Sequence, residues 1–112
     1  MIFIHHPIKT QTMSYQLKTK SGATEAVIDD NCGISKFYAI AHTLSEDLNV
    51  IFINQVDESE TLNWDFKYKD QFLTLHYNIF EGVSIYPQQL KSAYNGNHAV
   101  MEVAHFLERN AF

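Results

Sequence analysis

Residues 62–68, Leu-Asn-Trp-Asp-Phe-Lys-Tyr, decide the fold because apolar and polar side chains alternate at every position. A period of two is typical of a strand with one buried and one solvated face. Residues 73–77 repeat the pattern after a turn within residues 69–71, and residues 83–86 form a last short strand that ends at Pro87. The short connections predict an antiparallel meander.

The segments before this meander also read as strands. Residues 15–19 alternate, and residues 23–28 return as the second arm of a hairpin, with Gly22 suited to a positive φ in the turn. Residues 50–53, Val-Ile-Phe-Ile, are all apolar, which favours a strand covered on both faces near the sheet centre. Residues 1–12 are either a weakly ordered extension or the source of another edge strand.

Two segments have helical spacing. The first has an apolar stripe made of Ile34, Phe37, Tyr38, Ala41, Leu44 and Leu48. Asp29, Asp30 and Asn31 precede it and offer N-caps. The second helix is expected from about His98 to Asn110, after a polar loop over residues 88–97. Its apolar face centres on Val100, Val103, Ala104 and Leu107.

The predicted order is β-β-α-β-β-β-β-α, which defines an α+β fold. We expect a single domain over residues 1–112, because this length suits one domain and 46% of the residues are hydrophobic. The simplest arrangement is one twisted, mainly antiparallel sheet with both amphipathic helices on one face. Asp65 and Lys67 then lie on the other face, which can be polar and available to a partner.

Composition narrows the cellular setting. Cys32 is the one cysteine, so neither an internal disulfide nor a cysteine-based zinc site can form, and a reducing compartment is favoured. No stretch approaches the roughly 20 apolar residues of a membrane helix, and residues 1–4 are too short for a signal-peptide core. We expect a cytoplasmic protein that contacts no membrane and carries no cofactor.

Negative charge is concentrated in the middle of the chain. The net charge is −5, and residues 21–65 contain nine acidic side chains against the single base Lys36. Residues 1–20 contain three lysines and no acid, whereas residues 66–112 are balanced. A nucleic-acid partner is therefore not expected, because phosphate binding needs a basic surface.

Cys32 and His76 are the candidate catalytic pair. Cys32 lies just before a predicted helix, where the helix dipole lowers a thiol pKa, and cysteine before histidine is the chain order of papain-like and NlpC/P60-like peptidases. The neighbours Asn31, Gly33 and Ile34 do not reproduce the sequences around the nucleophile of those families. A thiol packed at the start of a helix is the alternative interpretation.

His98, Glu102 and His105 are the candidate metal ligands. They fall on one face of the second predicted helix and share the Glu-x-x-His spacing of di-iron bundles. A bundle site needs carboxylates from several other helices, and the chain offers only one other helix. The alternative is a solvated helix face that includes Arg109.

The acidic side chains are the candidate partner-binding residues. Asp57, Glu58, Glu60 and Asp65 are the first choice, with Asp29, Asp30, Glu46 and Asp47 behind them. Carboxylates among exposed aromatic side chains suit a basic protein, because charge speeds association and aromatic anchors hold the complex. An ordinary acidic surface that aids solubility is the alternative.

In size, acidity, aromatic content and lack of catalytic motifs, the chain resembles the immunity proteins of bacterial polymorphic-toxin and contact-dependent growth inhibition systems. Its closing pattern, a meander over residues 72–86 and a helix over residues 99–107, adds to the resemblance. The resemblance implies a non-enzymatic cytoplasmic inhibitor, an antitoxin that binds one basic toxin domain, such as a nuclease. The oligomeric state stays open.

Two other functions remain as alternatives. One is an adaptor or homodimer that uses an exposed sheet face. The other is a small cysteine-dependent hydrolase that uses Cys32 and His76.

Overall fold

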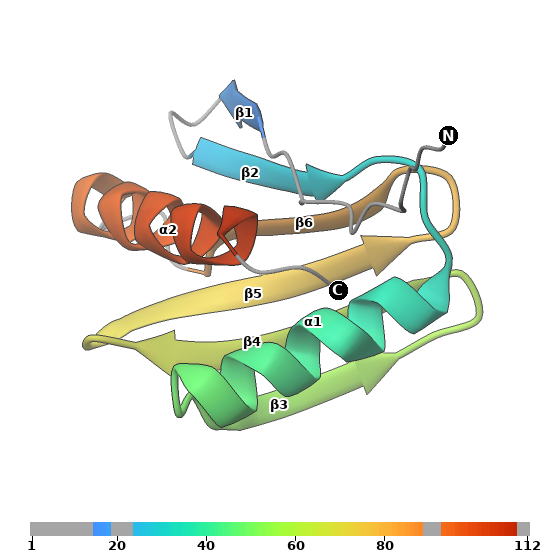
Figure 1. Cartoon of the computed structure of the whole chain (residues 1–112), viewed down its shortest axis with the longest axis horizontal. Helices are drawn as coiled ribbons and strands as arrows, with labels where there is room; N and C mark the ends of the chain where they lie inside the picture. The colour runs from blue at the N-terminus through green and yellow to red at the C-terminus, as the bar shows by residue number, and fades with distance from the viewer. Residues whose placement is uncertain (1–14, 19–23, 89–92, 110–112) are drawn as a thin grey trace, which may run out of the picture.

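The computed structural model describes residues 15–18, 24–88 and 93–109. The elements run in the order β1 (Tyr15–Lys18), β2 (Thr24–Asp29), α1 (Ile34–Asp47), β3 (Phe52–Asp57), β4 (Thr61–Tyr68), β5 (Gln71–Asn78), β6 (Gly82–Pro87) and α2 (Ala93–Glu108). This order confirms the predicted α+β class (Figure 1). The possible extension over residues 1–12 and the turn at residues 20–22 lie outside the described residues.

The six described strands form one antiparallel sheet in the order β1-β2-β6-β5-β4-β3. The alternating stretch from the sequence is β4, which pairs with β5 in unbroken register from Thr61 opposite Asn78 to Tyr68 opposite Gln71. Lys69 and Asp70 both have positive φ, as a two-residue hairpin turn requires. β2 inserts beside β6, so the first hairpin extends the meander.

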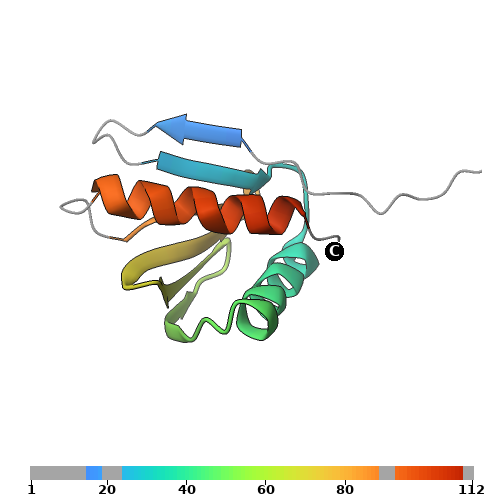
Figure 2. The same cartoon turned by 60° about the vertical axis from the view of Figure 1, so that its left-hand side comes forward.

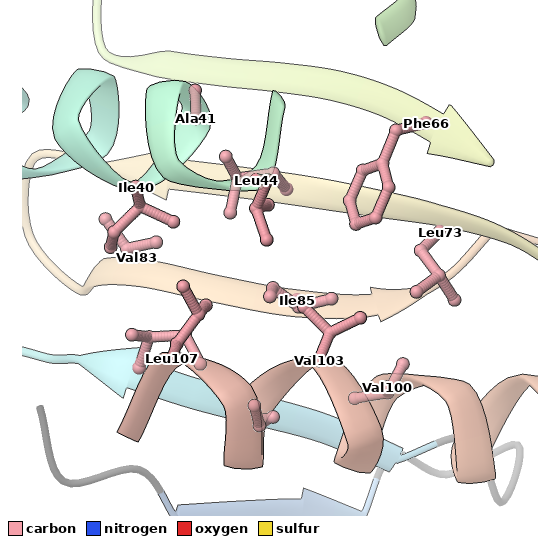
Figure 3. Packing of buried hydrophobic residues seen from close by; sticks show 14 of the residues in the cluster. Ile40, Ala41, Leu44, Phe66, Leu73, Val83, Ile85, Val100, Val103 and Leu107 are labelled. Atoms are coloured by element: carbon pink, nitrogen blue, oxygen red, sulfur yellow. The ribbon is translucent and has the colours of Figure 1, made fainter. Parts of the chain in front are cut away.

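Both helices pack on one face of the sheet (Figure 2). Figure 3 shows Ile40 and Leu44 of α1 and Val103 and Leu107 of α2 gathered over Val83 and Ile85 of β6. These six side chains are fully buried, and full burial of such a side chain stabilises the fold by about 1.5–3 kcal/mol. No described helix covers the opposite face, which we call the polar face: Asn63, Asp65, Thr74, His76 and Tyr86.

The prediction for residues 50–53 was wrong. The strand runs from Phe52 to Asp57 and lies at the edge of the sheet, bonded to β4 alone among the described strands. Val50 is 5% exposed and Phe52 packs against the core, but Ile51 is 76% and Ile53 56% exposed. A short apolar run has the same sequence whether its second face is covered or bare, so the pattern alone does not distinguish the two.

The predicted start of the second helix was also wrong. α2 begins at Ala93, so residues 93–97 of the expected polar loop are helical. Gly96, which falls in the expected loop, lies in the helix and allows close approach to β6, because a Cβ there would lie 2.8 Å from the Cβ of Pro87. Asn97 accepts a hydrogen bond of 2.7 Å from the N–H of Thr24, which fastens α2 to β2.

No helix in the described residues is both long and apolar enough to span a membrane.

Candidate partner-binding end

Three connections meet at one end of the sheet. They are the segment from β2 to α1, the β3–β4 loop and the β5–β6 turn, on the right of Figure 1. The N–H of Ile79 donates to the carbonyl oxygen of Glu60 at 3.1 Å, which joins the last two connections. Gly82 lies directly against the carbonyl of Asp29, which joins the first to them. Residues far apart in the sequence therefore form one surface.

This surface carries six carboxylates, and we call it the acidic end: Asp29, Asp30, Asp57, Glu58, Glu60 and Glu81. All of them except Asp29 are exposed. Five were candidate partner-binding residues, and the structure brings these five together. Glu81 was missed because it belongs to the electrically balanced last part of the chain. Its position in the turn after β5, the strand next to β4, is the signal that relates it to the β3–β4 loop.

Local hydrogen bonds orient two of these carboxylates. The indole N–H of Trp64 donates to Asp57 Oδ1 at 2.7 Å, and the hydroxyl of Thr61 donates to Glu58 Oε1 at 3.2 Å. The ring of Trp64 is itself held by edge-on contacts with Phe37 and Phe52. The start of the β3–β4 loop is thus fixed by its contacts with the core.

Asp29 stabilises the connection between β2 and α1. Its Oδ2 lies 3.2 Å from Nζ of Lys36, and its Oδ1 accepts the N–H of Asn31 at 2.9 Å. The first contact links the end of β2 to α1, and the second orders the connection between them. The pairing with Lys36 also offsets the charge of Asp29.

Exposed apolar side chains accompany the carboxylates. Phe80 is 75%, Ile79 47% and Ile34 45% exposed. Ile34 and Ile79, together with the buried Leu62 and Tyr77, line a hollow of about 240 Å³. The acidic end therefore combines charge with an apolar recess.

Three of the predicted partner-binding residues lie elsewhere. Asp65 is on the polar face, where its Oδ1 accepts the hydroxyl of Thr74 at 2.6 Å. Glu46 and Asp47 are exposed at the C-terminal end of α1. The helix begins at the acidic end with Ile34, so a rise of 1.5 Å per residue places Asp47 about 20 Å away from it.

A hydrogen-bonded cluster occupies the polar face. Oδ1 of Asn63 lies 2.7 Å from Nδ1 of His76 and accepts the hydroxyl of Tyr86 at 3.2 Å. Burial lowers the pKa of His76, although the charges of Glu25 and Glu81 oppose this. Burial also raises the pKa of Tyr86. Burial therefore favours the neutral form of both side chains.

The structure does not bring Cys32 and His76 together. Cys32 packs against the core on the helix side of the sheet, and its thiol donates to the carbonyl of Asp29 at 3.6 Å. His76 pairs with Asn63 on the polar face. Burial raises the pKa of the Cys32 thiol, and the charge of Asp29 adds to this. The position of Cys32 in the sequence predicted a lowered thiol pKa. Cys32 instead lies before the N-cap residue, Gly33, and the effect of burial on its pKa is the largest.

Glu102 connects α2 to the β4–β5 turn. Its Oε1 accepts the hydroxyl of Tyr68 at 3.0 Å and Nζ of Lys69 at 3.2 Å, and its Oε2 lies 3.3 Å from Nε2 of His98. Hydrogen bonds from Lys69 and then Tyr68 lower the pKa of Glu102. His105 is exposed one turn further along α2. Among the described residues, no group of three or more His, Cys, Asp and Glu side chains is placed to hold a metal ion.

Comparison with protein families, with curated proteins and with solved structures finds no match for this chain.

Proposed function

We propose that the protein is a non-enzymatic binding module whose acidic end binds a basic protein partner. One observation carries the proposal: carboxylates from three separate chain segments converge around exposed Ile34, Ile79 and Phe80. Clustered charge of one sign raises the rate of association with an oppositely charged protein, from roughly 10⁵–10⁶ M⁻¹s⁻¹ toward 10⁸ M⁻¹s⁻¹ or more. Apolar anchors then slow dissociation, because they lose contact with water in the complex.

The partner proposed is a toxin domain, and the protein is its immunity protein. The resemblance to immunity proteins of bacterial toxin systems supports this, and an acidic inhibitor suits a toxin whose own surface is basic, such as a nuclease that binds phosphates. The proposed compartment is the cytoplasm, where the single thiol of Cys32 stays reduced.

The test is affinity capture from the source cells with the tagged protein, at low and at high salt. The wild-type protein is expected to retain one basic protein at low salt and to release it at high salt. Added in equal amount, it is also expected to suppress that partner's toxic activity, measured as nucleic-acid cleavage if the partner is a nuclease.

Paired charge reversals locate the binding surface. Glu58→Lys with Glu60→Lys should strongly weaken retention of the partner. Glu46→Lys with Asp47→Lys makes the same change of charge at the far end of α1 and should leave retention intact. Equal loss in both variants would mean that total charge matters and the acidic end does not. Failure of the wild-type protein to retain any basic protein would end the proposal.

A second candidate function is self-association through the edge strand β3. Three apolar side chains at this edge are exposed: Ile51, Ile53 and Val56, of which Val56, the least exposed, is still 41% exposed. In addition, residues 48–56 contain no charged residue. Uncharged edge strands readily add another strand. A dimer in sedimentation equilibrium that becomes a monomer on Ile53→Lys would support it, and a wild-type monomer at high concentration would dismiss it.

A further inference from the structure

The hollow at the acidic end has two distinct parts. Most of its lining is apolar and includes the exposed Ile34 and Ile79 and the buried Leu62 and Tyr77. Its lining also includes two acidic residues, Glu58 and Glu60, which are both exposed. An occupant that complements both parts has an apolar stem and a positively charged tip.

We propose that the hollow holds one arginine side chain of the basic partner. The inference rests on the proposed function, and it names the chemical group that the acidic end recognises. The methylene groups of arginine can lie against Ile34 and Ile79, because long cationic side chains bury their stems on apolar surface and keep their charge at the edge. The guanidinium then pairs with the carboxylates of Glu58 and Glu60.

Size and geometry favour this occupant. The volume of about 240 Å³ is below the roughly 300–1,000 Å³ of sites that enclose a whole small molecule, so a single side chain fits better than a metabolite. The planar fork of guanidinium can bond two carboxylates at once and is less strongly hydrated than ammonium. The hydroxyl of Thr61, another lining residue, donates to Glu58 Oε1 and so restrains one of these two carboxylates.

The probe is N-acetyl-arginine methylamide, titrated into the full protein while isoleucine methyl signals are followed by NMR. The methyl signals of Ile34 and Ile79 are expected to shift and saturate, whereas those of the buried Ile40 and Ile85 stay in place and report an intact fold. N-acetyl-citrulline methylamide has the same shape without the charge. It should bind at least about tenfold more weakly, because charge-assisted hydrogen bonds are lost.

Two variants separate the parts of the hollow. Glu58→Gln with Glu60→Gln removes the charge and should weaken the arginine probe about tenfold or more. Ser59→Trp fills the hollow from an exposed loop position, keeps the net charge and should abolish the shifts at Ile34 and Ile79. Equal binding of the citrulline probe, or no shift at Ile34 and Ile79, would overturn the assignment.

The same variants distinguish this inference from the proposed function. If Ser59→Trp retains the captured basic partner at unchanged affinity while Glu58→Lys with Glu60→Lys loses it, the acidic end binds the partner without an arginine in the hollow. If the arginine probe binds as expected but no basic partner is ever retained, the hollow recognises arginine and the proposed function fails.

Discussion

Gly82 occupies a position that other residues cannot share. Its φ is +79°, and a Cβ there would overlap the carbonyl oxygen of Asp29. Gly82→Ala should therefore lower the free energy of unfolding by about 2 kcal/mol or more, measured by urea denaturation. Gly33→Ala is the matched control, because a Cβ at Gly33 meets no atom within 4 Å, and it should change stability by less than about 1 kcal/mol. Similar losses in both variants would contradict this account.

His76 makes stability depend on pH. Burial lowers its pKa below the ordinary 6.5 of an unfolded chain, so the unfolded state takes up a proton first as the pH falls. The folded state accordingly loses stability as the pH drops below about 6.5. The difference in unfolding free energy between pH 7.5 and pH 5.5 should shrink in His76→Gln. An undiminished difference in that variant would assign the effect to other histidines.

At the scale of elements, α1 has one buried and one exposed isoleucine. Ile40 is 0% exposed in the core, whereas Ile34 is 45% exposed at the acidic end. Ile40→Ala should cost about 2–5 kcal/mol of unfolding free energy, because it leaves a cavity between α1 and the sheet. Ile34→Ala should cost less than about 1 kcal/mol. Equal costs, measured by urea denaturation, would mean that α1 does not pack as described.

The elements also show how far the sequence predicts this structure. β4 was predictable because Leu62, Trp64 and Phe66 alternate with polar residues, and only one orientation buries that pattern. β3 was not, because the run from Val50 to Ile53 has no polar residue to mark its exposed face. The start of α2 was hidden since Gly96 is a helix breaker by local preference, and its contact with Pro87 is a tertiary effect.

The acidic end belongs to the scale of the whole molecule. The charge excess of residues 21–65 predicted an acidic surface, and it named five of the six carboxylates that the fold brings together. It also named Glu46 and Asp47, because they belong to the same acidic segment of the sequence. In the structure they lie about 20 Å away along α1. The position of Glu81 beside the other carboxylates and the formation of the hollow depend on which strands are neighbours in the sheet. The sequence patterns predict the strands but do not predict their order.

The association rate constant of the captured basic partner, followed by stopped-flow fluorescence, tests the central claim most directly. Raising NaCl from about 0.1 to 1 M shortens the Debye length from about 10 to 3 Å and screens exposed charges. The rate constant should fall at least about tenfold for the wild-type protein and for Glu46→Lys with Asp47→Lys. For Glu58→Lys with Glu60→Lys, it should start lower and change little with salt. The same salt dependence in all three proteins would contradict binding through the acidic end.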